Sequence, residues 1–168
     1  MTSIHLVISF VLLSILLGCR AESIKPNYST YKPILADRSS LNTIAFSAPR
    51  PIVTAGKIYA YKSYILINEV DKGYHIIDNQ DPTKPTPIGF LSILASHDVS
   101  VQNDILFSDN ATDLISVDIS DITSPRFLKR TVNVFPKQAP PDNLPLLDEY
   151  NLEDRPANTI VIEWRKRK

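Results

Sequence analysis

The chain has 168 residues, and its 18 Lys and Arg residues balance its 18 Asp and Glu residues. This neutral balance excludes the broad electrostatic field by which basic proteins bind nucleic acid or anionic lipid. Because there is a single cysteine, an internal disulfide is also excluded, and one domain of this length must be held together by burial of apolar side chains.

The chain begins with an apolar segment that is typical of an export signal. Residues 1–18 carry no Lys, Arg, Asp or Glu, and Leu6–Leu17 is an almost unbroken apolar run. Crossing a bilayer takes about 20 apolar residues, whereas this run has the length of a signal-peptide core. We therefore predict that residues 1–18 are a signal peptide and not a transmembrane helix.

The apolar run ends in Leu16-Leu17-Gly18-Cys19, and polar residues follow at once. This junction resembles the lipobox of bacterial lipoproteins. The resemblance implies cleavage before Cys19 and attachment of lipid to the Cys19 thiol, which would anchor the protein in the cell envelope. Arg20 after the cysteine favours the outer membrane. The alternative is a plain apolar helix with a buried free thiol at Cys19.

Residues 19–50 are predicted to be the lipidated N-terminus and a flexible tether. The stretch from Glu22 to Pro49 is rich in Ser, Pro, Lys and Asn and has only weak hydrophobic periodicity. Such a composition favours an extended linker between a membrane anchor and a folded domain.

Residues 51–135 contain an internal repeat with two units, 56–95 and 96–135. Ile65 aligns with Ile105 and Leu66 with Leu106, and the same offset holds along both units without a gap. The other matched pairs are Asp78 with Asp118, Asp81 with Asp121, Thr83 with Thr123, and Pro85 with Pro125.

Each unit is predicted to form consecutive short strands separated by turns. The predicted strands are 58–61, 64–67, 74–77 and 88–93 in the first unit, and 99–101, 104–107, 114–119 and 127–134 in the second. This spacing is typical of β-propeller blades, of which about four to eight close a propeller. The predicted fold is therefore all-β: two propeller-blade-like antiparallel β repeats that form an incomplete propeller.

In each unit an aliphatic strand ends in Asp and leads into a proline-containing turn, over Tyr74–Pro85 and Leu114–Pro125. These motifs resemble the LVIVD repeat of bacterial and archaeal surface proteins, although Ile122 replaces Pro82 in the second unit. The resemblance implies a propeller fold, and the region resembles the N-terminal part of longer envelope lipoproteins. Truncation of such a protein, closure by oligomerisation and a small sandwich remain alternatives.

Residues 136–168 are predicted to be a Pro-rich segment with a terminal strand, Thr159–Trp164, and a basic tail. The tail, Trp164–Lys168, could bind a phosphate-rich surface. A solvated, frayed tail is favoured, because charges at a chain terminus need no partner.

Candidate catalytic and metal-binding residues are few. His75 is expected to be a partly buried strand histidine. His97 lies beside Asp98, but no nucleophile motif accompanies it, so we do not expect it to act as a general base. The aspartates of the repeated turns are expected to form Asx turns and not to bind calcium. Gly73 is expected to supply a positive φ before Tyr74. We predict no catalytic residue, no metal site and no cofactor.

The function predicted from these features is a non-enzymatic, membrane-anchored lipoprotein. Its β-repeat region would bind or scaffold an envelope protein or a glycan, and no nucleic acid. Two alternatives remain. The chain could be a fragment of a longer LVIVD-repeat lipoprotein without an independent function, or an enzyme whose site lies in missing or shared blades.

Overall fold

The computed structural model describes residues 27–168, so the predicted signal peptide, its cleavage site and Cys19 lie outside the described residues. Residues 27–168 form an all-β fold with three antiparallel sheets, none closed on itself, and two short 3-10 helices. Within this range no helix is long and apolar enough to cross a membrane. The elements are β1 (Tyr31–Asp37), η1 (Arg38–Asn42), β2 (Ala45–Ser47), β3 (Ala55–Tyr61), β4 (Tyr64–Glu69), β5 (Gly73–Asp78), β6 (Thr86–Ser92), β7 (Val99–Gln102), β8 (Ile105–Asn110), β9 (Asp113–Asp118), β10 (Arg126–Thr131), η2 (Asp148–Tyr150) and β11 (Thr159–Lys166).

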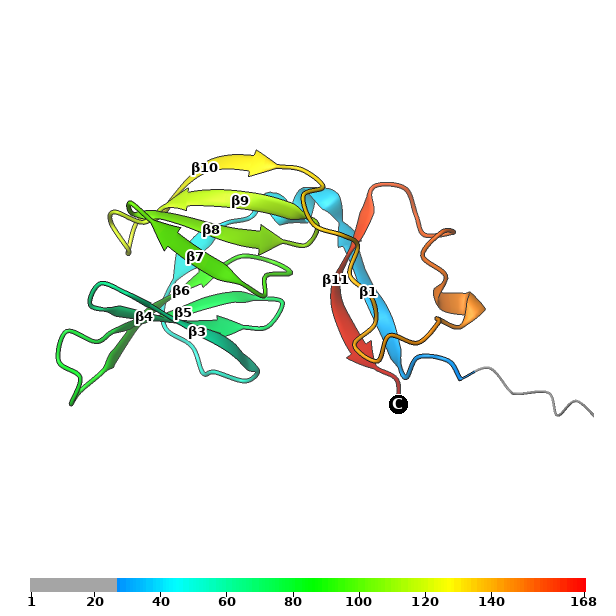
Figure 1. Cartoon of the computed structure of the whole chain (residues 1–168), viewed down its shortest axis with the longest axis horizontal. Helices are drawn as coiled ribbons and strands as arrows, with labels where there is room; N and C mark the ends of the chain where they lie inside the picture. Colours follow the sequence, from blue (N-terminus) through cyan, green and yellow to red (C-terminus); the bar gives the residue numbers. More distant parts are fainter. Residues whose placement is uncertain (1–26) are drawn as a thin grey trace, which may run out of the picture.

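The repeated region folds as two antiparallel meanders that lie side by side in Figure 1. We call β3–β6 the first meander and β7–β10 the second meander; β2 adds a fifth strand at the β6 edge of the first. All eight predicted strands of the two units are present. The fourth strand of the first unit and the third of the second each end one residue earlier than predicted, and the last ends three residues earlier, at Thr131. The prediction of an all-β fold with antiparallel β repeats is confirmed.

The turns between the third and fourth strands are built alike in the two meanders. Asp81 Oδ1 accepts hydrogen bonds from the Thr83 N–H (3.0 Å) and hydroxyl (2.7 Å). Asp121 accepts the same two bonds from Thr123, at 3.0 Å and 2.7 Å. Asp78 and Asp118 likewise accept a backbone N–H from two residues further on. The predicted Asx turns are therefore confirmed, since the carboxylates serve the backbone of their own loops.

The alignment without a gap is wrong by one residue over the first half of the repeat. Tyr61 pairs with Tyr64 across the β3–β4 hairpin, and Gln102 pairs with Ile105 across the β7–β8 hairpin. Tyr61 is therefore equivalent to Gln102, and not to Val101 as the gapless alignment has it. Asp78 and Asp118 stay equivalent. The difference lies in the length of the next hairpin loop. This loop has three residues in the first meander (70–72, after β4) and two in the second (111–112, after β8).

The hairpin loop after β4 ends at Gly73, which has a φ of 136°. A Cβ atom at this position would also overlap the backbone carbonyl oxygen of Leu91 on β6. The predicted positive φ at Gly73 is therefore confirmed, and the close approach of β6 gives a second reason for glycine.

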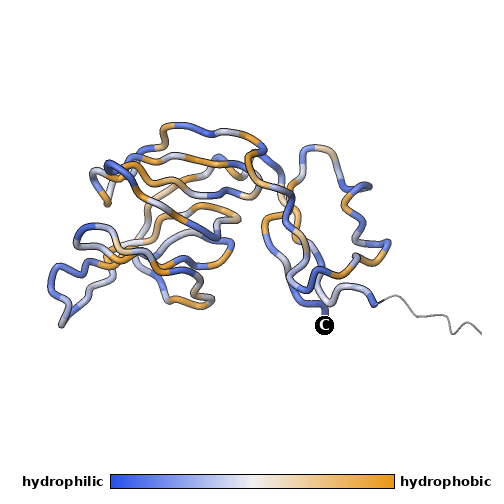
Figure 2. The backbone as a smooth tube through the Cα atoms, in the orientation of Figure 1, coloured by the Kyte–Doolittle hydropathy of each residue, from blue (hydrophilic) through white to orange (hydrophobic). Residues whose placement is uncertain are grey.

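The main core lies between the two meanders. The buried residues on the first meander's side are Leu66, Tyr74, Ile76, Leu91 and Ile93, and those on the second meander's side are Val99, Leu106, Ile115, Val117, Ile119 and Ile122. In Figure 2 hydrophobic stretches run along the facing strands of both meanders. Tyrosine hydroxyls cross the interface as well, since Tyr59 donates to the Val101 carbonyl (3.3 Å) and Tyr74 to the Asp98 carbonyl (2.7 Å).

The shifted register decides which side chains of the second meander face away from this core. Phe107 and Ser116 pair on adjacent strands, alternate with buried neighbours, and are equivalent to Leu66 and Ile76 of the first meander. We call this side of the second meander, with Ser100, Phe107, Leu114 and Ser116, the outer face. It corresponds position by position to the face by which the first meander packs on the second.

Residues 31–47 are ordered, so the prediction of a flexible tether is wrong for this part of the chain. β1 pairs with β11, and η1 and β2 follow. The basic tail also differs from the prediction, because Arg165 and Lys166 belong to β11 and pair with Lys32 and Tyr31. In Figure 1 the β1–β11 sheet lies at one end of the two meanders. Its junction with them contains the buried residues Leu41, Ala95, Ala111 and Ile160.

Candidate functional site

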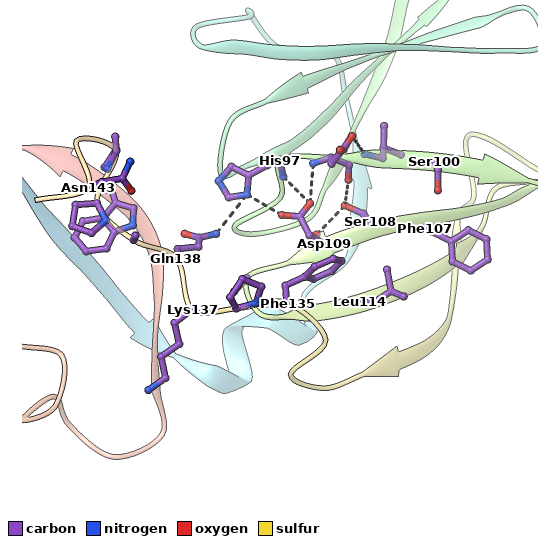
Figure 3. A pocket seen from close by; sticks show the side chains of 18 residues that line it. His97, Ser100, Phe107, Ser108, Asp109, Leu114, Phe135, Lys137, Gln138 and Asn143 are labelled. Carbon is purple, nitrogen blue, oxygen red and sulfur yellow. Dashed lines mark hydrogen bonds and ion pairs between the residues drawn. The ribbon is translucent and has the colours of Figure 1, made fainter.

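A cleft of about 900 Å³ opens between the outer face of the second meander and the Pro-rich segment 135–143. Its apolar walls are formed mainly by Phe107, Leu114, Phe135 and Trp164. Figure 3 shows Phe107 and Leu114 projecting from neighbouring strands, with Phe135 and His97 nearby. The size and apolar character are those of a ligand-binding cleft.

The Pro-rich segment that closes the cleft is held at both of its ends. The Phe135 N–H donates to the Thr112 carbonyl (2.9 Å) at the hairpin after β8, and the Ser29 N–H donates to the Pro145 carbonyl (2.8 Å). Pro136, Pro140 and Pro141 between these points have restricted φ angles. The predicted linker is therefore one wall of the cleft, and Trp164 from β11 contributes to the same lining.

His97 lies at the edge of the cleft between two carboxylates. Its Nδ1 is 2.8 Å from Asp109 Oδ2, and its Nε2 is 2.9 Å from Asp71 Oδ1. The other oxygen of Asp109 accepts the backbone N–H groups of His97 (2.8 Å) and Asp98 (2.9 Å). Figure 3 shows the contact of His97 with Asp109 and a longer one with Gln138. The ring is thus fixed between the β4–β5 loop and the end of β8.

These contacts determine the charge of His97. The hydrogen bonds to Asp109 and Asp71 outweigh partial burial and raise the pKa of His97 to about 9. At neutral pH the ring is therefore an imidazolium, with both nitrogens protonated and no lone pair to accept a proton. The neighbouring Asp98 forms an ion pair with Lys57 instead. These contacts suit a structural role for His97, in which it joins the β4–β5 loop to β8, better than the role of a general base.

His75 belongs to a second buried pair, in the first meander. Its Nε2 lies 3.0 Å from Glu69 Oε2, and the Glu69 carboxylate also accepts the N–H groups of Val53 (2.9 Å) and Thr54 (2.6 Å). Burial acts to raise the pKa of Glu69, but the bonds from Val53, His75 and Thr54 outweigh it and lower the pKa. His75 is buried on β5, more completely than predicted, and both partners are satisfied within the fold.

The protonation of His97 predicts a dependence of stability on pH. Its pKa is about 9 in the folded chain and 6.5 as the ordinary value, so the stabilisation is fully present below pH 6.5 and is lost as the pH rises through 9. Because 42% of the side chain is exposed, we expect the loss in unfolding free energy to be only about 1–2 kcal/mol. Urea unfolding of the unmodified chain and of His97→Gln between these pH values measures it. A His97→Gln variant that loses as much stability as the unmodified chain would contradict the assignment.

Among residues 27–168 there is no group of three or more His, Cys, Asp or Glu side chains placed to hold a metal ion. Two buried polar atoms of the cleft residues have no hydrogen-bond partner in the same range: the acceptor Gln138 Oε1 and the donor Trp164 Nε1. Buried polar atoms are normally paired, so these two mark unmet hydrogen-bonding capacity beside the apolar walls.

Comparison of the chain with protein-family models, with curated proteins and with solved structures finds no match.

Proposed function

We propose that the chain is an exported, lipid-anchored binding module without catalytic activity, and that it takes a protein partner in the cleft. The observation that carries the proposal is the cleft itself, about 900 Å³ in volume and lined by Phe107, Phe135 and Trp164. Aromatic side chains in a concave site are typical anchors of protein partners. The lipid anchor rests on the lipobox-like junction at Cys19.

The two meanders are proposed to be blades of an incomplete propeller, in line with their resemblance to LVIVD repeats. The equivalence of their faces supports this: the positions by which the first meander contacts the second are equivalent to those that form the outer face of the second. In a propeller each blade packs on the next in this way. The outer face is more polar, with Ser100 and Ser116 at the positions of Tyr59 and Ile76. Polar outer faces are typical of terminal repeats, so we propose that this face meets a ligand and not a third blade.

A protein partner fits the cleft better than a glycan does. Polar side chains such as Ser100 and Asn143 also line the cleft, but apolar surface predominates in it. A protein partner with apolar side chains matches this surface, whereas a glycan presents mainly hydroxyl groups. Catalysis is not supported, because both nitrogens of His97, the nearest histidine, are engaged with carboxylates.

A scaffolding role is the second candidate, and one exposed strand favours it. Ile58 on β3 is 69% exposed, whereas Val99, the equivalent residue on β7, is 8% exposed because the first meander covers it. Ile52 and Val53 are exposed nearby in the chain. An apolar sheet face of this kind accepts another β-sheet, in the way that the second meander accepts the first.

Site-specific photo-crosslinking separates these two functions. We would replace Phe107 in the cleft, Ile58 on the first meander, or the exposed Phe127 on β10 by benzoylphenylalanine and irradiate cells that export the protein. Cleft binding predicts a protein adduct from position 107 that Leu114→Asp abolishes, with no adduct from positions 58 or 127. An adduct from position 58 alone would favour scaffolding. Equal adducts from all three positions would contradict a specific site.

A further inference from the structure

Basic side chains gather at the free end of the β1–β11 sheet, where the chain termini of the described region meet (Figure 1). Antiparallel pairing places Lys32 opposite Arg165, and Tyr31 opposite Lys166. The Arg167 N–H then donates to the Thr30 carbonyl (2.8 Å), so the strands continue side by side past the end of β11. We call this end, with Lys32, Arg165, Lys166, Arg167 and Lys168, the basic end.

Most of its charge is not neutralised within the fold. Arg165 pairs with Glu163 at 3.1 Å. Arg167 donates to the Ser29 carbonyl, which leaves its charge in place. Lys32, Lys166 and Lys168 form no ion pair with any residue from 27 to 168.

The basic end surrounds a hollow of about 610 Å³. Lys32, Lys166, Arg167 and Lys168 line it together with Thr30, Tyr150 and one carboxylate, Glu149. That carboxylate is hydrogen-bonded to Tyr150, whose pKa it raises. Four cationic side chains against one engaged carboxylate give the hollow an excess of positive charge on a chain whose overall charge is zero. The hydrophilic colouring of Figure 2 continues to this end of the chain.

The basic end lies close along the chain to the predicted lipid anchor. Nine residues lie between Cys19 and Ser29, where the basic end begins, so the ten steps from Cys19 to Ser29 reach at most about 35 Å. The buried Ser29 is held by Asp142, which accepts its hydroxyl hydrogen bond at 2.8 Å. The start of β1, and with it the basic end, is therefore fixed relative to the rest of the fold.

We propose that the basic end binds the phosphate groups of anionic lipids and sets the module against the membrane surface. This rests on the lipid anchor of the proposed function. Lys and Arg side chains next to an anionic bilayer each strengthen binding about fivefold, and they act together with a lipid anchor. A lipid anchor alone fixes the distance of the module from the bilayer, whereas the basic end would also fix its orientation.

The test uses the chain from residue 19 with Cys19→Ser, which carries no lipid and contains all described residues. Its sedimentation is measured with vesicles of phosphatidylcholine, with and without phosphatidylglycerol. We expect binding to the mixed vesicles alone, weakening as salt rises. The triple variant Lys32→Ala, Lys166→Ala, Lys168→Ala should bind roughly 100-fold more weakly. The matched triple variant Lys57→Ala, Lys84→Ala, Lys129→Ala, exposed lysines outside the basic end, should bind like the unmodified chain.

Three outcomes would overturn the proposal. One is an absence of binding to the mixed vesicles, and another is equal loss in the two triple variants. The third is displacement of the chain from the vesicles by inorganic phosphate at constant ionic strength, which would make the hollow a site for free phosphate. Circular dichroism of each variant excludes unfolding as a cause. Because the protein tested has no lipid, failure here leaves lipidation of Cys19 untouched, and failure of lipidation leaves this result untouched.

Discussion

Asp113→Ala is expected to lower the free energy of unfolding by about 3–5 kcal/mol, because it removes the carboxylate partner of Arg130, whose side chain is only 15% exposed, and of Arg38. The Asp113 side chain is 1% exposed and binds Arg38 (2.6 Å) and Arg130 (3.0 Å), and it accepts the N–H of Asn133 (3.0 Å). Arg130 also donates to the Leu41 carbonyl (2.8 Å), so the network joins η1 to the second meander. Burial acts to raise the pKa of Asp113, but the bonds from Asn133, Arg130 and Arg38 outweigh it and lower the pKa, which keeps the group ionised.

Urea unfolding at neutral pH measures this loss. Glu153→Ala is the matched control, since Glu153 is an exposed carboxylate without an ion pair in the described range, and we expect it to change stability by less than about 0.5 kcal/mol. If Asp113→Ala costs no more than Glu153→Ala, the network does not hold the N-terminal segment to the second meander.

Ile76→Ser is expected to cost about 3–5 kcal/mol, the second large effect. Ile76 is fully buried between the meanders, so the change opens a cavity and buries a hydroxyl without a partner. The opposite substitution, Ser116→Ile, falls at the equivalent position of the second meander, on the outer face. It should change stability by less than about 0.5 kcal/mol, because the side chain there is only half-buried.

The two substitutions together test whether equivalent positions have different environments. Thermal unfolding of both variants gives the comparison, and analytical ultracentrifugation shows whether Ser116→Ile promotes self-association through its more apolar outer face. Similar losses in the two variants would mean that the outer face is covered like the contact face. That result would contradict its assignment as a ligand-binding surface.

The repeated strands could be predicted because apolar alternation and Asp- and Pro-containing turns recur in both units. The one-residue shift could not, because Ile105-Leu106 repeats Ile65-Leu66 and so makes the gapless alignment look complete. Only the hairpin pairing reveals the shorter loop after β8. β1 is not predictable from the sequence, because it contains Pro33 and its partner β11 lies near the opposite end of the chain.

The cleft could not be predicted for a similar reason. Its lining comes from β8, the Pro-rich segment and β11, which are brought together only by long-range pairing. The sequence draws attention to His97 and its neighbour Asp98, but the partners of His97 in the structure are Asp71 and Asp109. For Asp113 one signal existed, since a charged residue stands at the position of Gly73 in the first unit.

The proposed lipid anchor is tested most directly by the intact mass of the protein extracted from the membranes of bacteria that express the full chain. A lipid-anchored module predicts the mass of residues 19–168 plus a diacylglycerol group and at most one further acyl chain, with the lipid on Cys19. The mass of the complete 168-residue chain, or of a chain cleaved elsewhere without lipid, would contradict it.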